Sequence, residues 1–260
     1  MFTKKIRKII NKKNNQKIIC LTAYSKNIAK ILDKHCDIVL VGDSLGSVLY
    51  NFHSTKKVSL RMMIDHAISV RAGTVNSLMV VDMPFKTYRN QKDALKNAKM
   101  IIKKTKCDAV KLEGGKKIIP IIKTLIRNKI PVMGHLGILP QTDKKFVFKG
   151  KKFEEKKQIF DDAILLEKSG VFSIVLECTE KNLSRDITNK LKIPTIGIGA
   201  SVNCDGQVLV TDDLLGLSDG SYKFVKKFTN MRKIIGLAVK KFKSEVQKKQ
   251  FPKAKHSFKN

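Results

Sequence analysis

Short apolar runs alternate with amphipathic stretches along most of the chain. The apolar runs predict buried strands, and the stretches between them carry the spacing of amphipathic helices. Between Gln91 and Lys104, for example, Ala94, Ala98 and Ile101 fall on one helical stripe. The expected strands are Ile18–Leu21, Ile38–Val41, Leu78–Val81, Ala109–Leu112, Val132–Gly134, Ser173–Leu176 and Thr195–Ile198, with an eighth near Tyr222–Val225. The expected helices are Asn27–Cys36, Ser59–Arg71, Gln91–Lys104, Lys116–Arg127, Glu154–Lys168 and Asn182–Lys190.

This alternation predicts an α/β fold with parallel strands and right-handed crossovers. The chain has 260 residues, close to the ~250 typical of a closed eight-stranded barrel. We therefore expect one (β/α)8 TIM-barrel catalytic domain over residues 1–260. Helical extensions are expected at both ends: an N-terminal helix within 1–17, with Ile6, Ile9 and Ile10 on one face, and a basic C-terminal arm at 240–260.

The chain is strongly basic, with 53 Lys and Arg residues against 22 Asp and Glu residues and a formal net charge of +31. Only seven of the basic residues are arginines, and the lysines are spread along the chain rather than gathered on one motif. Readers of nucleic acid usually rely on arginine, so the excess suggests a coding bias rather than a specific nucleic-acid partner. The alternative that is not an enzyme is a basic RNA- or ribosome-associated protein in which the barrel has no catalytic role.

Neither a secretory signal nor a membrane span is expected, because no apolar run approaches ~18–20 residues and no apolar stretch follows the first charges. The chain has five cysteines and no CxxC pair. This number and spacing point to a reducing compartment and favour neither a disulfide scaffold nor a zinc site.

Polar side chains end five consecutive predicted strands. The active site of a TIM barrel lies where the carboxyl ends of its strands meet. A single carboxylate there can simply cap the next helix, but five strands in a row are hard to explain in this way. The residues at these ends are Asp43, Ser44, Asp82, Lys111, Glu113, His135 and Glu177.

Buried charges of this kind are costly unless they meet each other or a cation. Asp43, Asp82 and Glu113 offer hard oxygen ligands, which suit Mg²⁺. A 2-oxo acid could chelate the same ion, which would draw charge onto the keto oxygen as an enolate forms. Glu177 stands apart on the sixth strand and is the candidate base. Lys111 would neutralise the substrate.

His135 has two interpretations that the sequence does not separate. It could orient the substrate, or it could satisfy a buried backbone group. The glycine-rich stretch Gly197–Ala200 is neither a phosphate-binding loop of the Walker type nor a complete dinucleotide motif, so it supports no nucleotide site.

Seven motifs occur in the order and spacing of the ketopantoate hydroxymethyltransferase family, which the chain resembles over nearly its whole length. The motifs are VGDSLG at 41–46, DMPF at 82–85, VKLEGG at 110–115, GHLGILPQ at 134–141, LEC at 176–178, IGIGA at 196–200 and DGQVLV at 205–210. The resemblance extends to FPKAKHSF at 251–258.

The resemblance implies a cytoplasmic enzyme that transfers the one-carbon unit of 5,10-methylenetetrahydrofolate to 3-methyl-2-oxobutanoate. The products would be 2-dehydropantoate and tetrahydrofolate, in the first step of the pantothenate pathway. Carried over by motif, Asp43 and Asp82 would bind one Mg²⁺ per subunit, with Glu113 completing the site directly or through water. Asp43, Ser44, Asp82 and Lys111 would contact the oxo acid, and Glu177 would accept the proton. The resemblance also implies homodecamers.

The chain departs from the family pattern away from these residues. Phe52–Thr55 replaces a glycine-aspartate before Ser-Thr, a proline is missing at Ser221–Phe224, and Lys255 stands where an acidic residue is common. The basic loop Thr142–Lys152, a candidate lid or contact, is shortened. The alternative enzyme is another Mg²⁺-dependent barrel that forms 2-oxo acid enolates, such as an aldolase or a phosphonopyruvate-type mutase or lyase.

Overall fold

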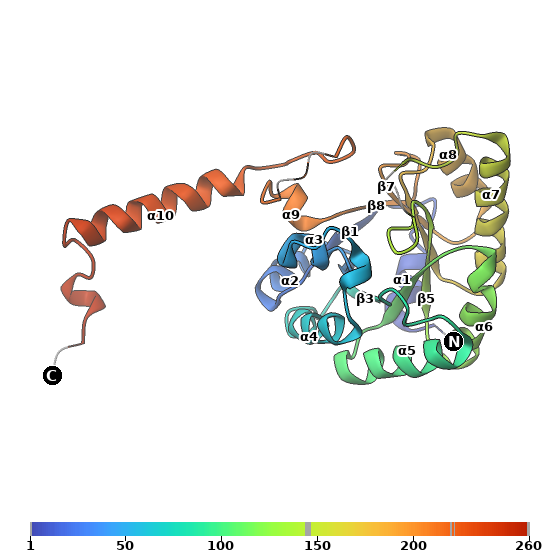
Figure 1. Cartoon of the computed structure of the whole chain (residues 1–260), viewed down its shortest axis with the longest axis horizontal. Coiled ribbons are helices and arrows are strands. Elements are labelled where there is room, and N and C mark those ends of the chain that lie inside the picture. Colours follow the sequence, from blue (N-terminus) through green and yellow to red (C-terminus); the bar gives the residue numbers. More distant parts are fainter. Residues whose placement is uncertain (1, 144–146, 219, 221, 259–260) are drawn as a thin grey trace. The chain divides into compact units, whose positions relative to one another are not determined.

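Eight parallel strands close into a barrel, each paired with its neighbours in chain order and the last with the first (Figure 1). This computed structural model describes the chain except residues 1, 144–146, 219, 221 and 259–260. The chain forms two compact units, residues 1–210 and 211–260. The strands are β1 Ile18–Thr22, β2 Ile38–Val41, β3 Leu78–Asp82, β4 Ala109–Glu113, β5 Val132–Gly137, β6 Ser173–Glu177, β7 Thr195–Ile198 and β8 Gly206–Leu209. The predicted barrel class is confirmed.

Helices follow most of the strands, as the periodicity predicts. In α5, Ala94, Ala98 and Ile101 are buried, and Asn90 caps the first turn by accepting a hydrogen bond from the Asp93 N–H. Residues 199–205 connect β7 to β8 without a helix. The helices of the barrel unit are α1 Lys4–Ile10, α2 Lys26–Leu32, α3 Leu45–Tyr50, α4 Leu60–Arg71, α5 Gln91–Thr105, α6 Ile119–Arg127, α7 Phe153–Lys168 and α8 Lys181–Lys190, with 3₁₀ turns at Thr55–Lys57 and Lys116–Ile118.

The predicted eighth strand, Tyr222–Val225, is wrong. The strand that closes the barrel is Gly206–Leu209, which pairs with β1 and β7. It is short, and Val208 is its one large buried apolar side chain. The neighbouring Gln207 is exposed. A Cβ at Gly206 would lie 2.5 Å from the Ile18 carbonyl oxygen, so the close approach of β8 to β1 requires glycine there.

The N-terminal helix closes one end of the barrel. Ile6 and Ile9 of α1 are buried in the same cluster as Ile18, Ile38 and Leu78, which begin β1, β2 and β3. The predicted helix within 1–17 is therefore present, although it ends at Ile10. A second, larger buried cluster fills the layer between the strands and the outer helices. The carboxyl ends of the strands are left for polar side chains.

The outer surface of the barrel is not covered uniformly. Every residue of β2, β3 and β4 is buried, whereas Ile19 of β1 is 45% exposed and Gln207 of β8 is exposed. These outward-facing side chains belong to the two strands on either side of the barrel closure. The exposed Ile19 side chain can therefore pack against another apolar surface.

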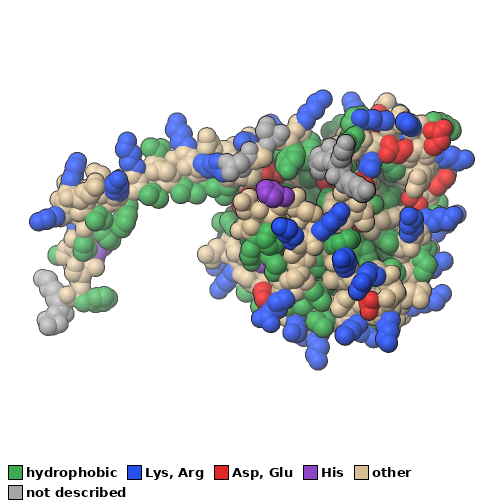
Figure 2. Space-filling model, in the orientation of Figure 1, with side chains coloured by type: hydrophobic (Ala, Val, Ile, Leu, Met, Phe, Trp, Pro, Cys, Tyr) green, Lys and Arg blue, Asp and Glu red, His purple; other side chains and the backbone are tan. Residues whose placement is uncertain are grey.

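The C-terminal unit contains α9 Thr211–Leu214, α10 Met231–Gln247 and a 3₁₀ turn at Ala254–His256. The predicted basic arm at 240–260 thus begins inside α10. This helix has no buried residue, and its apolar side chains gather along one side, with Lys and Arg side chains along the other (Figure 2). The exposed apolar side chains of α10 are Ile234, Ile235, Leu237, Val239, Phe242 and Val246.

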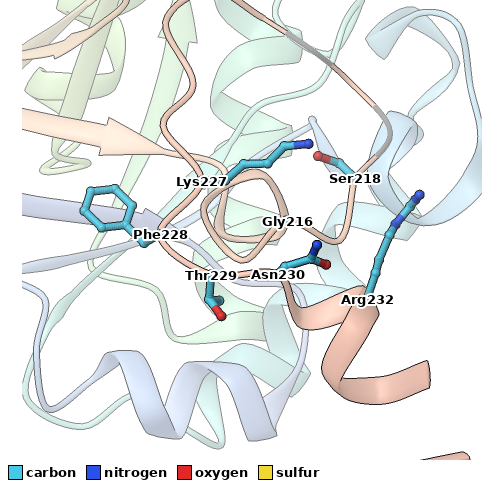
Figure 3. A pocket seen from close by; sticks show the side chains of 7 residues that line it. All are labelled: Gly216, Ser218, Lys227, Phe228, Thr229, Asn230 and Arg232. Atoms are coloured by element: carbon cyan, nitrogen blue, oxygen red, sulfur yellow. The ribbon is translucent and has the colours of Figure 1, made fainter. Parts of the chain in front are cut away.

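A pocket of about 480 Å³ lies within this unit, before and at the start of α10 (Figure 3). Lys227, Phe228 and Arg232 are among its lining residues, and the Arg232 Nε donates a hydrogen bond to the Leu217 carbonyl at 2.6 Å. None of the predicted site residues lines it. Across the described residues, no helix is both long enough and apolar enough to cross a membrane.

A buried ion pair fastens the segment after α1 to the closing strands. The Lys13 Nζ donates to the Asp205 Oδ2 at 2.8 Å and to the Thr188 carbonyl at 2.8 Å. The same carboxylate oxygen accepts from the Thr195 N–H at 2.8 Å. The side chains of Lys13 and Asp205 are only 7% and 5% exposed, so each depends on the other for compensation of its charge.

We expect Lys13→Met to lower the free energy of unfolding by about 3–5 kcal/mol, because the buried Asp205 carboxylate would lose its cation. Urea denaturation followed by circular dichroism measures this change. The control is Lys8→Met, at an exposed lysine of α1, where the change should stay within about 0.5 kcal/mol. Equal stability of the two variants would contradict this role for Lys13.

Candidate active site

The carboxyl ends of β2 to β6 bring the predicted polar side chains together. The strand register sets Asp82 beside Lys111 and Glu113 beside His135, and Glu177 lies beside Gly137 at the end of the next pair. Asp43 follows β2, and its backbone N–H donates to the Asp82 Oδ2 at 3.1 Å. The grouping expected from the strand ends is therefore present in the fold.

Most of this cluster is buried. Asp43, Asp82, Lys111 and Glu113 are each at most 5% exposed. Glu177 is more accessible, with 16% of its side chain exposed. A candidate base at the edge of the cluster can reach a substrate that the buried groups hold.

Lys111 is the cation of the cluster. Its Nζ lies 3.1 Å from the Asp82 Oδ1 and 3.3 Å from the His135 Nδ1. Burial alone would lower the pKa of Lys111, but the carboxylates of Asp82 and Glu113 raise it above its usual range. The ammonium group therefore stays charged at neutral pH and faces the same space as the carboxylates.

His135 connects Lys111 with Glu177. Burial and the charge of Lys111 lower the pKa of His135, so the imidazole is neutral at neutral pH. An ammonium group only donates hydrogen bonds, which makes Nδ1 the acceptor and places the proton on Nε2. The Nε2 lies 3.2 Å from the Glu177 Oε2, yet it makes no aligned hydrogen bond to any described residue. A substrate oxygen could accept from this N–H.

The carboxylates outnumber the cations. Burial, followed by the charge of Asp82, raises the pKa of Asp43 to about 7. Burial and the charge of Asp43 raise the pKa of Glu113 well above its usual range. Lys111 is the single cation facing this group among the described site residues, so three buried carboxyl groups share one positive charge. A divalent cation would compensate the negative charge that they acquire on ionisation.

The donor set fits Mg²⁺ bound partly through water. No three His, Cys, Asp or Glu side chains in the described part of the chain are placed to enclose an ion by themselves. Mg²⁺ usually keeps several waters and takes one or two carboxylates. Asp82 supplies a suitable oxygen, because its buried Oδ1 accepts no hydrogen bond from any described residue. Asp43 and Asp82 would hold the ion, with Glu113 contributing through water.

Three further residues complete the site, and strand-end reasoning misses them. The Tyr24 hydroxyl lies 2.8 Å from the Ser44 Oγ, which fixes the position of that serine. The Gln141 side-chain amide donates to the Asp43 Oδ2 at 2.8 Å, and its Oε1 accepts from the Tyr88 hydroxyl. Gln141 ends the motif GHLGILPQ, but a neutral amide in a loop gives no chemical signal by itself.

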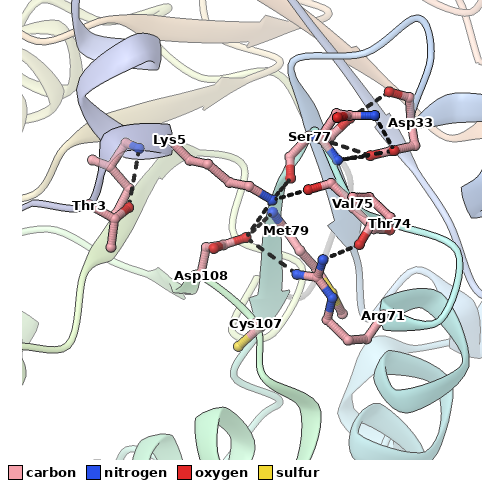
Figure 4. A network of polar contacts seen from close by, with 12 residues as sticks. Thr3, Lys5, Asp33, Arg71, Thr74, Val75, Ser77, Met79, Cys107 and Asp108 are labelled. Atoms are coloured by element: carbon pink, nitrogen blue, oxygen red, sulfur yellow. Dashed lines mark hydrogen bonds and ion pairs between the residues drawn. The ribbon is translucent and has the colours of Figure 1, made fainter.

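Carboxylates at the opposite end of the barrel have a different environment (Figure 4). Asp33 accepts hydrogen bonds from the backbone N–H groups of Asn76 and Ser77, and these bonds outweigh burial and lower its pKa. Asp108 accepts from the Met79 N–H at 2.9 Å, with Arg71 3.7 Å away. These groups are satisfied by backbone N–H groups, whereas the three buried carboxyl groups at the carboxyl ends of the strands share Lys111 as their cation.

Comparison with known proteins identifies close relatives. A family profile described as ketopantoate hydroxymethyltransferase matches residues 3–254. The chain is 66% identical to a 3-methyl-2-oxobutanoate hydroxymethyltransferase of Pelagibacter ubique strain HTCC1062, over 98% of this chain and 99% of that protein. It is 46% identical to the protein of the same description from Rhizobium etli, over 95% and 92% of the two chains.

Solved structures with low sequence identity share the fold. A phosphonopyruvate hydrolase in complex with oxalate and Mg²⁺ aligns with a TM-score of 0.63 at 9% identity, covering 98% of this chain and 93% of the other. A 2,3-dimethylmalate lyase of the PEP mutase/isocitrate lyase superfamily aligns with a TM-score of 0.62 at 10% identity, covering 99% and 89%. These likenesses support the barrel architecture.

We expect Asp43→Asn to stabilise the metal-free protein at pH 8. The pKa of Asp43 is about 7 in the folded chain against 3.8 for a free carboxyl, so ionisation destabilises the fold increasingly as pH rises from about 4 to 7. The gain in the free energy of unfolding should be about 2–4 kcal/mol at pH 8 and should shrink towards zero near pH 4. Urea denaturation in EDTA at several pH values measures it.

Asp33→Asn is the matched control for this prediction, because the pKa of Asp33 is shifted in the opposite direction. This variant should destabilise the chain at pH 8. A destabilised Asp43→Asn protein at pH 8 would contradict the electrostatic description of the cluster.

Proposed function

The chain belongs to the ketopantoate hydroxymethyltransferase family, and we propose that it transfers the one-carbon unit of 5,10-methylenetetrahydrofolate to 3-methyl-2-oxobutanoate. With water supplying the hydroxyl group, the products are 2-dehydropantoate and tetrahydrofolate, in the first step of the pantothenate pathway. The observation that carries the proposal is the cluster of buried carboxyl groups around Lys111 at the carboxyl ends of the strands. This arrangement suits an acidic 2-oxo acid that must lose a proton.

Each residue has a role that follows from its position. Lys111 pairs with the negative charge of the oxo acid, and the N–H on the His135 Nε2 donates to a substrate oxygen. Ser44, held by Tyr24, contacts the same substrate. Glu177 is beside His135 at the accessible edge of the cluster, where its carboxylate takes the proton from C3. C3 then forms the new bond to the one-carbon unit as one of its two bonds to folate nitrogen breaks. Water replaces the second nitrogen and becomes the hydroxyl group, and the two nitrogens take up the proton from C3 and one proton of the water.

One Mg²⁺ per subunit belongs to this proposal. Asp43 and Asp82 would hold it, with Glu113 contributing through water, and its Lewis acidity would stabilise negative charge on the keto oxygen. The support for the ion is the set of three buried carboxyl groups, Asp43, Asp82 and Glu113, which share Lys111 as their cation. The catalytic domain would span residues 1–260 of a cytoplasmic enzyme. Dependence on folate separates this function from a barrel enzyme of the aldolase or phosphonopyruvate type.

Glu177→Gln should lower kcat for 2-dehydropantoate formation by roughly 10²–10⁴, the usual contribution of a positioned base. Binding of Mg²⁺ and of 3-methyl-2-oxobutanoate, followed by calorimetry, should change by less than about threefold. The wild-type chain should form product only when the folate donor is present.

Glu180→Gln is the control for this variant. Glu180 caps α8 three residues further on, and its carboxylate accepts from the Asn182 and Leu183 N–H groups. Its kcat should stay within about threefold of wild type. Wild-type turnover by Glu177→Gln would remove Glu177 from the mechanism, and turnover without folate would refute the proposed reaction.

We also propose that the chain forms homo-oligomers, as the family resemblance to decamers suggests. The exposed apolar side of α10 supports this proposal, because an apolar stripe of this kind along a helix is typical of interfaces. The proposed partners are small-molecule substrates and further copies of this chain. Neither a specific nucleic acid nor a membrane is part of the proposal.

Light scattering after gel filtration should give a mass that is a multiple of 29.3 kDa, and about 293 kDa for ten copies. Ile235→Glu, on the apolar side of α10, should reduce that mass, whereas Lys240→Glu, at a charged position of the same helix, should not. A monomeric wild-type chain would contradict the proposal.

A further inference from the structure

Gln141 occupies a buried position among the carboxylates of the candidate site. It belongs to the loop after β5, and only 1% of its surface is exposed. Its side-chain nitrogen donates to the Asp43 Oδ2 at 2.8 Å and to the Met83 carbonyl at 3.0 Å. Its backbone N–H donates to the Glu113 Oε2 at 3.1 Å. One residue thus contacts carboxylates from two different strand ends.

The orientation of the Gln141 amide is fixed by its partners. The Met83 carbonyl and the Asp43 carboxylate only accept here, so they must face the NH₂ group, and both of its N–H bonds are used. The Oε1 on the other side accepts from the Tyr88 hydroxyl. Tyr88 in turn accepts from the Glu113 N–H at 3.4 Å. A reversed amide would set its oxygen against two acceptors, so Tyr88 and Met83 select a single arrangement.

This arrangement leaves one oxygen of each carboxylate for other ligands. Gln141 takes the Asp43 Oδ2 and the Glu113 Oε2, so the Asp43 Oδ1 and the Glu113 Oε1 remain for an ion or its waters. Hydrogen bonds that fix metal-ligating carboxylates in this way usually affect metal affinity 10–100-fold. Both donors also favour the ionised carboxylates, which are the forms that bind a cation.

We propose that Gln141 is a positioning residue for the metal site, held in its orientation by Tyr88. It acts through Asp43 and Glu113 and touches neither substrate nor the reacting atoms. The inference deepens the proposed function, because it rests on a divalent cation at this cluster. The turn that contains Gln141 is closed by the Asp143 side chain, which accepts from the Leu139 N–H at 3.1 Å.

The test measures binding of Mg²⁺ alone by calorimetry, and of Mn²⁺ by electron paramagnetic resonance, without substrate or folate. Gln141→Met keeps the approximate volume of the side chain and removes its two side-chain N–H donors, while the backbone N–H to Glu113 remains. This variant should weaken the affinity for Mg²⁺ about 10–100-fold. Thr142→Val is the matched control, because Thr142 is the next residue and is exposed. Its affinity should stay within twofold of wild type.

A double-mutant cycle tests the role of Tyr88. Tyr88→Phe removes only the hydroxyl group that orients the amide, and should weaken Mg²⁺ binding by a smaller factor. In the Gln141→Met background the same change should have a smaller effect than in wild type, because the contact between the two side chains is already lost and only the contact of the Tyr88 hydroxyl with the Glu113 N–H remains. At saturating Mg²⁺, kcat of Gln141→Met should recover to within about threefold of wild type, which a general loss of structure would not allow.

The outcomes separate this inference from the proposed function. Wild-type Mg²⁺ affinity in Gln141→Met, with the wild-type chain itself binding the ion, would overturn the role of Gln141 and leave the metal site standing. An equal loss in Thr142→Val would overturn it as well. A wild-type chain that binds no divalent cation would overturn both proposals.

Discussion

The excess of buried carboxyl groups over cations at the carboxyl ends of the strands is the constraint on which the rest of the site depends. Asp43, Asp82 and Glu113 are buried around Lys111, and burial together with mutual repulsion raises the pKa of Asp43 and of Glu113. A fold keeps such a group only if the remaining structure supplies enough stability. Here the opposite end of the barrel is closed by apolar side chains of α1. The buried carboxyl groups therefore lower the stability of the fold, and the apolar packing of α1 at the other end of the barrel compensates for this.

The barrel separates these two demands in space. Its strands begin at an apolar plug, where carboxylates such as Asp33 and Asp108 are satisfied by backbone N–H groups. The same strands end in groups whose hydrogen-bonding and charge needs the fold leaves partly unmet, as at the Asp82 Oδ1 and the His135 Nε2. Unmet needs of this kind are what a metal ion and an acidic substrate can satisfy. Stability and chemistry are in this way assigned to opposite ends of the same strands.

The strand ends could be predicted from sequence because a short apolar run followed by a polar residue is a local pattern. Parallel strands then bring those residues together without further information. The eighth strand could not be found in this way, because Gly206–Leu209 is short and has one large inward-facing apolar side chain. Gln141 and Tyr88 could not be predicted from the sequence for another reason. Their roles depend on contacts between loops far apart in the chain, 53 residues in this case, and neither side chain is unusual in its local sequence.

We propose that the cluster removes a proton from C3 of a 2-oxo acid with the help of a divalent cation. The most direct test is proton exchange at C3 of 3-methyl-2-oxobutanoate in D₂O, followed by NMR in the absence of folate. We expect exchange that requires Mg²⁺ and stops when EDTA is added. Exchange that proceeds equally well without the ion would contradict the metal site, and no exchange under either condition would contradict the proposed chemistry.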